Sequence, residues 1–171
     1  MHMRNQGIIK NVSLGMNDST YALQILKGKP DNTFDSVMLA GSWNLMDQGG
    51  LELLSECQRR GIKVHNAGIF ASGLLVGGSH YKYASANSEI LERRDRWTKL
   101  ALKHNVSLPA VAIAFSLLYT VIEKIAVGVK SAKEVRAVTE WLVSASTVPS
   151  KIWHEAKREG LLAENVLVPS M

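Results

Sequence analysis

Short apolar runs recur at a constant spacing along the first half of this chain. They start near Ile8, Asp35 and Ile62, a step of 27 residues each time. One strand, one helix of about ten residues and two loops fill such a step, which is close to the ~30 residues of a βαβ unit. Stretches with an amphipathic helical pattern separate the runs. The spacing therefore predicts an α/β fold with parallel strands covered by helices.

The pattern predicts four strands and six helices. The strands are expected at 8–14, 37–40, 62–67 and 124–129. Helices are expected at 21–26 behind the cap Asp18-Ser19, at 51–60 before Gly61, at 89–104 behind Ser88, at 109–119 behind Ser107, at 135–142 behind the capping box Ser131 to Glu134, and at 152–156 before Gly160. We expect the tail, 161–171, to be a surface strap.

Length and composition place the chain among globular proteins. Its 171 residues suffice for a single domain spanning 1–171, and 46% hydrophobic with 20% charged residues exclude a disordered chain. No apolar run approaches the ~20 residues of a membrane span, and no apolar segment follows Met1–Gln6 as in a secretory signal. The only cysteine, Cys57, cannot form an internal disulfide and is expected half-buried in a helix. These features favour a cytoplasmic protein without membrane association.

The distribution of charges and of potential metal-ligating residues limits which kinds of partner the chain can bind. The net charge of +5 is spread along the chain and not interleaved with aromatic residues, which gives little support to nucleic-acid binding. A moderate basic excess also suits an anionic small ligand. With one cysteine and no two histidines three or four residues apart, the sequence predicts no metal site.

The stretch from Ile62 to Gly78 changes from a strand into a loop of small residues, Gly68 to Gly73. Small residues just after a strand let a ligand approach the backbone, and the N–H groups of such a loop can hold a phosphate. The alternative is a plain strand exit made of turn residues.

Four parallel strands leave two arrangements open. An open sheet has two bare edges, whereas repeated βα units can also close into an eight-stranded barrel, of which this chain supplies half. In a half-barrel we expect the inward side chains to be only partly covered, and we therefore expect oligomerisation. The side chains concerned are Val12, Leu14, Val37, Leu39, Val64 and Val127.

The order of several longer motifs resembles the C-terminal half of an aldo-keto reductase. The motifs are VSLGMND (12–18), DSVMLAGSWNLMDQ (35–48), IKVHNAGIFASGLL (62–75), LPAVAIAFSLL (108–118), KIAVGVKSAKEVRA (124–137) and PSKIWHEAKREGLL (149–162). Within that family the chain is most similar to dehydrogenases of L-fucose and D-threo-aldoses and to pyridoxal dehydrogenases. The resemblance implies strands five to eight of a (βα)8 barrel.

The resemblance also implies a nicotinamide dinucleotide, NADP or NAD. Its phosphates would lie against Phe70, Ser72, Gly73 and Leu75, and its adenosine end against Gly128, Val129, Lys130, Ser131 and Arg136. Asn17 would hold part of the carboxamide. Lys130 and Arg136 flank a helix N-terminus and tilt the expectation towards NADP. The alternative is that Ser131 only caps its helix and both cations are solvated.

The chain departs from the family in the residues that do chemistry. Ala67 stands where many members stack a tyrosine on the nicotinamide, and Ala40 where many have a glutamine. The catalytic Asp, Tyr, Lys and His of the family lie on strands two to four, so no catalytic residue is assigned, and His65 is expected to be structural.

Three functions remain open. In the first, the chain is the cofactor-binding half of an oxidoreductase for aldoses or small aldehydes, and a second copy or a missing N-terminal half completes it. Alternatively it is an inactive remnant that binds a nucleotide or a protein, or a reductase with unrelated catalytic residues.

Overall fold

A four-stranded parallel sheet forms the centre of the computed structural model, which describes residues 2–170; Met1 and Met171 lie outside the described residues. Its strands are β1 (Ser13–Met16), β2 (Ser36–Ala40), β3 (Lys63–Ala67) and β6 (Ile122–Ala126), and they lie side by side in the order β1-β2-β3-β6. Leu14 and Val64 flank Val37 in register. The predicted α/β class with parallel strands is confirmed.

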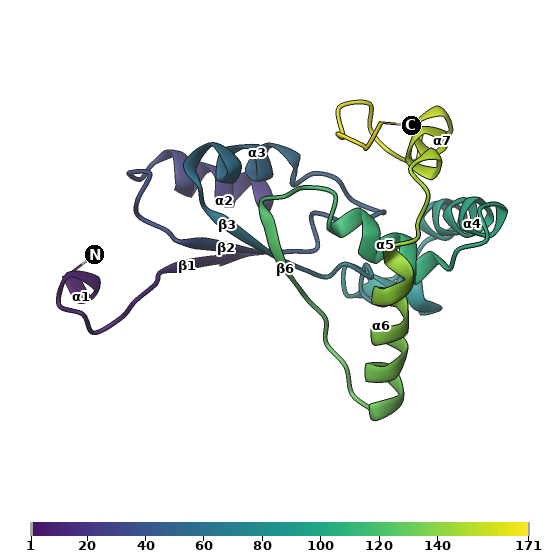
Figure 1. Cartoon of the computed structure of the whole chain (residues 1–171), viewed down its shortest axis with the longest axis horizontal. Coiled ribbons are helices and arrows are strands. Elements are labelled where there is room, and N and C mark those ends of the chain that lie inside the picture. The colour runs from purple at the N-terminus through teal and green to yellow at the C-terminus, as the bar shows by residue number, and fades with distance from the viewer. Residues whose placement is uncertain (1, 171) are drawn as a thin grey trace.

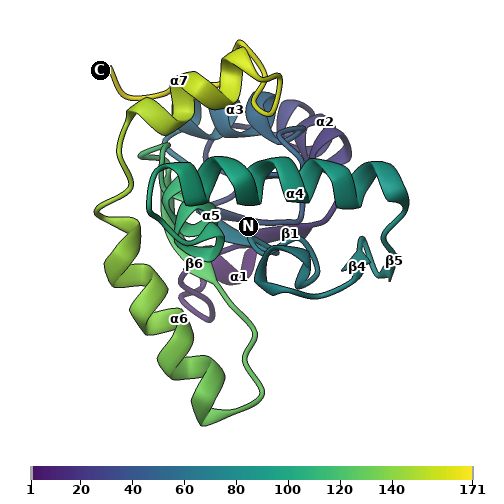
Figure 2. The ribbon, with the colours of Figure 1, turned by 90° about the vertical axis from the view of Figure 1, so that its right-hand side faces the viewer.

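One helix precedes the first strand, two lie over one face of the sheet, and the later helices lie beyond the carboxyl ends of the strands (Figures 1 and 2). They are α1 (His2–Asn5), α2 (Ser19–Lys27), α3 (Leu51–Arg60), η1 (Leu74–Val76), α4 (Ser88–Lys103), α5 (Leu108–Ser116), α6 (Ala132–Ala145) and α7 (Lys151–Arg158). A small antiparallel hairpin, β4 (His80–Tyr81) and β5 (Ala84–Ser85), precedes α4. None of the described helices is long and apolar enough to cross a membrane.

The helix ends follow the capping pattern closely. Asp18, Ser107 and Ser131 accept the N–H groups of Tyr21, Ala110 and Glu134, as expected from their positions. The cap of α4 is Asn87, which accepts the N–H of Ile90, so the prediction of Ser88 was wrong by one residue. Asn is as good an N-cap as Ser, and the sequence alone does not separate two adjacent candidates.

The first and last strands lie elsewhere than predicted. Residues 8–12 are not a strand: the N–H groups of Ile8 and Ile9 donate to the carbonyl oxygen of Met3, and the Asp35 carboxylate accepts the N–H of Val12 at 2.7 Å. The strand begins only at Ser13, so the first step is 23 residues rather than 27. The fourth strand ends at Ala126, and residues 127–130 form a loop.

The two faces of the sheet differ sharply. Val37, Leu39 and Val64 are fully buried, so the prediction that these side chains are only partly covered was wrong. They point towards the face that carries α2 and α3, while none of the helices within residues 2–170 covers the opposite side of β1 to β3 (Figure 1).

The bare face carries one large apolar side chain, Met38, among small and polar residues. Gly15, Met38 and His65 are on it by the alternation of the strands. Nearby Lys63 pairs with Glu123 at 2.6 Å, and His65 lies 3.6 Å from the same carboxylate. Leaving this face in water therefore costs less than an apolar face would.

Aromatic side chains hold the helices beyond the sheet together. Trp43 stacks on Phe115 at 4.9 Å and meets Tyr119 edge-on at 5.0 Å. The tail contributes to the same core, since Leu161, Leu162 and Val166 are buried. The expected surface strap is therefore wrong for this part of the tail; Met171, its last residue, lies outside the described residues. Cys57 is fully buried, not half-buried, and burial raises the pKa of its thiol to about 12.

Two loops at the carboxyl ends of β2 and β3 are joined by one buried side chain. Asn44 donates to the carbonyl oxygens of Gly41 (2.9 Å) and Gly68 (3.4 Å), and its Oδ1 accepts the N–H groups of Met46 and Asp47. Gly68 has φ +70°, and a Cβ there would lie 3.0 Å from the backbone nitrogen of Gly41. The loops touch through backbone, without room for a side chain.

This contact predicts that Gly68→Ala destabilises the fold. Alanine costs about 1–2 kcal/mol in a left-handed conformation, and the crowded Cβ adds to that. We expect the free energy of unfolding in urea to fall by about 2–3 kcal/mol. Gly128→Ala is the matched control, because its Cβ would meet nothing within 4 Å and its φ is not positive. Equal effects of the two substitutions would contradict the close contact.

A second prediction concerns α7. The carboxylate of Glu155 forms an ion pair with Lys103 and lies 2.8 Å from Nε2 of His104. These contacts join α7 to the end of α4. The hydrogen bond with Lys103 and then that with His104 lower the pKa of Glu155 below its ordinary 4.5. The stabilisation is present above pH 4.5 and is lost as the pH falls through the lowered pKa. Glu155→Gln should lower the melting temperature at pH 7, and the melting temperature of the variant should fall less than that of the wild type as the pH is lowered. The same decrease of the melting temperature below pH 4.5 in both proteins would contradict this role.

Candidate functional site

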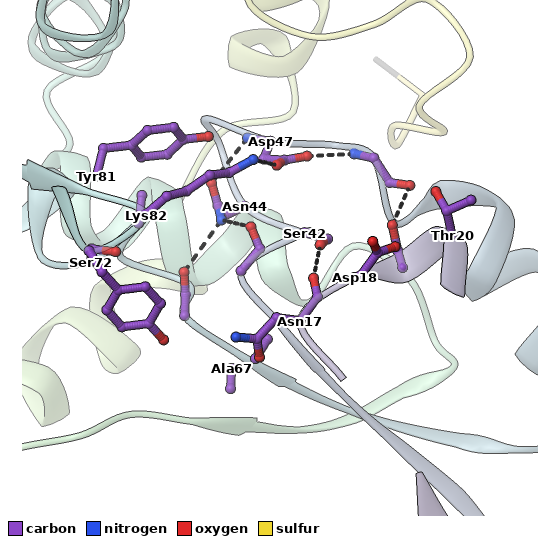
Figure 3. Close-up of a pocket in the computed structure, with 17 residues that line it drawn as sticks. Asn17, Asp18, Thr20, Ser42, Asn44, Asp47, Ala67, Ser72, Tyr81 and Lys82 are labelled. Carbon is purple, nitrogen blue, oxygen red and sulfur yellow. Dashed lines mark hydrogen bonds and ion pairs between the residues drawn. The ribbon is translucent and has the colours of Figure 1, made fainter. Parts of the chain in front are cut away.

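A cavity of about 680 Å³ lies where the strands β1, β2 and β3 end. Its wall consists of Asn17 to Thr20 after β1, residues of 40–49 after β2, Ala67 to Ser72 after β3, and Tyr81 to Tyr83 of the hairpin. In open parallel sheets, ligands bind at this carboxyl edge. Figure 3 shows Asp18 and Thr20 on one side of the cavity and Tyr81, Lys82 and Ser72 on the other.

Hydrogen bonds fix the side of the cavity next to α2. Ser42 Oγ donates to the carbonyl oxygen of Asn17 at 2.6 Å, and Ser19 Oγ donates to that of Gly49 at 3.0 Å. Asp18 holds the first turn of α2 through the N–H of Tyr21 at 2.9 Å. The loops after β1 and β2 are thus held together, with Asn17 lining the cavity.

An ion pair holds the hairpin across the cavity. Lys82 Nζ lies 2.9 Å from Asp47 Oδ2, while Asp47 Oδ1 accepts the N–H of Gly49 (Figure 3). The hydrogen bond with Asp47 raises the pKa of Lys82, so this side chain stays charged. Burial raises the pKa of the neighbouring Tyr81 phenol, which therefore stays neutral.

Backbone strain gathers at this cavity. Among the described residues, five other than glycine have positive φ, and four of them line it: Ala71 (50°), Ser72 (59°), Lys82 (48°) and Tyr83 (66°). Such conformations persist only where the surrounding structure enforces them, and they concentrate at functional sites. The strain marks this cavity as the best candidate site.

A second hollow of about 210 Å³ adjoins the first. It lies between the loop after β3, with Phe70 and Gly73, and the loop after β6, with Val127 and Gly128. Gly68 and Ser72 line both hollows. The two hollows thus lie side by side between the end of β1 and the end of β6.

The structure brings together only part of the predicted set. Asn17 and Ser72 line the large cavity, and Phe70, Ser72, Gly73 and Gly128 line the small one. Leu75 is buried in the core, and its N–H donates to the carbonyl oxygen of Phe70. Its side chain therefore does not face either hollow.

The residues around the start of α6 lie apart from both hollows. Ser131 Oγ accepts the N–H of Glu134, and Glu134 Oε2 accepts the N–H of Lys130 at 2.8 Å. Arg136 lines a separate groove on α6, and Val129 is exposed. Figure 2 shows α6 projecting below the sheet, with its first turn at the far end and its last turn leading up to α7. The capping role of Ser131 is confirmed, and the Glu134 carboxylate at this helix start disfavours a phosphate there.

Sequence reasoning missed many of the residues that line the large cavity, among them Asn44, Asp47, Lys82 and Tyr83. The Asn44 turn could have been recognised from its Asx pattern, Asn followed by Asp three residues on. The hairpin carries no Asn-Gly or Asp-Gly signal, so its turn was not recognisable. Among residues 2–170, no group of three potential metal ligands comes together.

Comparisons with known proteins agree on one family. The model of the aldo/keto reductase family matches residues 1–151. The chain is 31% identical to the pyridoxal 4-dehydrogenase of Microbacterium luteolum, covering 94% of this chain and 47% of that one. It is 26% identical to the D-threo-aldose 1-dehydrogenase of a Pseudomonas species, covering 98% and 50%. The chain thus spans about half the length of the curated relatives it matches.

Solved structures show the same fold. The holo form of the aldo-keto reductase AKR11C1 from Bacillus halodurans matches with a TM-score of 0.68 and 20% identity, over 97% of this chain and 55% of that one. The glycerol dehydrogenase AKR11B4 from Gluconobacter oxydans matches with a TM-score of 0.51 and 17% identity, over 86% and 53%. With its four parallel strands, the sheet is consistent with part of such a barrel. The chain belongs to the aldo/keto reductase family.

Proposed function

We propose that this chain is the NAD(P)-binding part of an oxidoreductase for aldoses or small aldehydes, a single domain (1–171) corresponding to strands five to eight of the family's barrel. The observation that carries this is the pair of adjoining hollows that meet at Gly68 and Ser72. A dinucleotide is an elongated ligand, and a path along the carboxyl edge of parallel strands suits it. Relatives named as dehydrogenases support the reaction class.

The residues present fit a dinucleotide unevenly. Asn17 would hold the carboxamide end, and Phe70, Ser72 and Gly73 the phosphates. Gly73 and Gly128 leave open space where a side chain would stand, which allows close approach to the backbone. Gly128, Val129, Lys130, Ser131 and Arg136 would hold the adenosine end. This end fits less well, because Ser131 caps α6 and Arg136 lies in another groove.

Lys130 and Arg136 support NADP over NAD, and Glu134 opposes it. Two cations near a helix N-terminus attract an additional phosphate. The Glu134 carboxylate is held against the N–H of Lys130 and would repel that phosphate. We propose NADP as the preferred cofactor, with NAD also accepted.

The chemistry requires residues that this chain does not contribute. We propose that the chain is inactive alone, with the catalytic groups supplied by another half-barrel. A cytoplasmic location is part of the same proposal. The alternative is an inactive remnant that binds a nucleotide or a protein partner. Titration with dinucleotides tests the nucleotide-binding part of this alternative.

A partner for the bare edges is the second part of this proposal. Strands β1 and β6 each have one neighbour in the sheet. Exposed apolar side chains gather at both ends: Ile8, Ile9 and Tyr21 near β1, and Val135, Leu142 and Val143 on α6. Closure of a barrel would cover both edges and such residues. We propose a second copy, or a missing N-terminal half, as the covering partner.

Titration with NADP⁺ and NAD⁺ by calorimetry tests cofactor binding. We expect NADP⁺ to bind more tightly than NAD⁺. Lys130→Gln or Arg136→Gln should lower the affinity for NADP⁺ by about threefold to tenfold and leave the affinity for NAD⁺ unchanged. Lys151→Gln on α7 removes an exposed cation far from both hollows and should change neither affinity. Absence of binding by both dinucleotides would leave the inactive, protein-binding remnant as the better account.

Sedimentation velocity tests the partner. The chain alone should self-associate as its concentration rises, and Leu142→Glu together with Val143→Glu should shift it towards monomer. Leu102→Glu, an equally exposed apolar position on α4, is the control that should not. A single monomeric species at every concentration would contradict association of two copies.

A further inference from the structure

Helix α6 projects from the rest of the chain and turns one side to solvent (Figures 1 and 2). None of its residues is buried. Its inner side packs against α5 and through Trp141, whose ring meets that of Phe70 edge-on with the centroids 5.7 Å apart. A helix has 3.6 residues per turn, so Thr139 lies about half a turn from Trp141. Thr139 therefore marks the outer face of α6, and it is exposed.

A row of apolar side chains runs along this outer face. Val135, Thr139 and Val143 follow one another at a spacing of four residues, which places them above one another on a helix. Val135 is 49% exposed and Val143 is 69% exposed. The row borders a surface groove of about 520 Å³, whose other lining residues are Arg136, Glu140 and Ser144. Exposed apolar side chains that gather beside a groove, with charges at its rim, are typical of an interaction surface.

The row is symmetric about Thr139, because a valine stands four residues to either side of it. A two-fold axis at Thr139 that relates two antiparallel copies of α6 would set Val135 of each copy against Val143 of the other. Rows with a spacing of four residues are also the ones that fit into each other's grooves in the commonest class of helix pair. The outer face of α6 is therefore complementary to itself.

The charges beside the row favour the antiparallel arrangement. Arg136 and Glu140 lie on one flank of the row, and within residues 2–170 neither forms an ion pair. In an antiparallel two-fold pair the same flank of both helices lies on the same side, so Arg136 of each copy meets Glu140 of the other. In a parallel pair the two flanks lie on opposite sides, and the charges do not meet.

We infer that the outer face of α6 is the docking surface for the same face of a second copy of this chain, with the two helices antiparallel about Thr139. The inference rests on the second part of the proposed function, the association of two copies, and it names the surface that makes the contact. It also gives Arg136 a partner other than a cofactor phosphate. One pair of helices makes a small interface, so we expect weak association that increases with protein concentration.

Exchange of the two charges tests the pairing in sedimentation velocity. Arg136→Glu alone or Glu140→Arg alone brings like charges together and should raise the dissociation constant of self-association at least about tenfold. The double variant restores opposite charges and should associate like the wild type. Lys151→Glu is the matched control, because it reverses an exposed charge on α7 rather than on α6. A double variant as weak as the single ones would overturn the ion pairs between the copies.

Cysteine cross-linking tests the position of the two-fold axis. The native Cys57 is fully buried, so an introduced surface thiol is not confused with it. Thr139→Cys should form an intermolecular disulfide under mild oxidation, because the axis brings the two copies of this residue together. Lys133→Cys, on the same helix, lies six residues from the axis, which separates its two copies by about 18 Å along the helices. A disulfide that forms equally well at both positions would overturn the pairing.

A mixture of two variants tests the orientation of the helices. Val135→Cys and Val143→Cys each lie four residues from the axis, so two equal thiols are about 12 Å apart along the helices, too far for a disulfide. Either variant alone should therefore stay uncross-linked, and the mixture should form the mixed disulfide. Cross-linking of Val135→Cys with itself would indicate a parallel pair and overturn the inference.

The outcomes separate this inference from the proposed function. Self-association without cross-linking of Thr139→Cys overturns the α6 surface and leaves a second copy as the covering partner. A monomer at every concentration, without cross-linking, overturns the inference and leaves only a missing N-terminal half as that partner. Cross-linking of Thr139→Cys in a chain that binds neither dinucleotide upholds the α6 pair and overturns the cofactor-binding part of the proposed function.

Discussion

The contact between the loops after β2 and β3 is the constraint on which the site depends. Asn44 makes it with four hydrogen bonds, two donated to Gly41 and Gly68 and two accepted within its own turn. The side chain is fully buried, so each bond would leave an unsatisfied polar group if it were lost. The two loops that line the large cavity are therefore fixed by one buried side chain together with the close backbone approach of Gly68 to Gly41.

The rest of the site is attached to that turn. Asn44 and Asp47 exchange backbone hydrogen bonds, which places the Asp47 carboxylate against Gly49 on one side and Lys82 on the other. Lys82 holds the hairpin across the cavity, and the hairpin carries Tyr83. Ser72, one of the left-handed residues of 68–73, lies on the same side of the cavity as the hairpin (Figure 3) and lines both hollows. Strain on that side is tolerated because hydrogen bonds and one ion pair fix the adjoining turn.

Much of this fold follows from sequence patterns, and the failures have physical reasons. Helix α3 and the caps Asp18, Ser107 and Ser131 were predicted correctly, because periodicity and capping are local. The start of β1 was wrong, since Asp35 contacts Arg4 and Val12 from 31 and 23 positions away, and local periodicity does not reveal such contacts. The partial exposure predicted for Val37, Leu39 and Val64 was wrong, because alternation does not say which face meets the helices. The Lys82-Tyr83 turn gave no signal, since its residues are not those that favour such a turn.

Mapping of backbone amide shifts on addition of NADP⁺ tests the central claim most directly, namely that the two hollows form one dinucleotide path. We predict saturable changes at Asn17, at 68–73 and at 128–131, all with one dissociation constant, and none at α1 or α7. Changes confined to the α6 groove around Arg136, or separate constants for the two hollows, would contradict it.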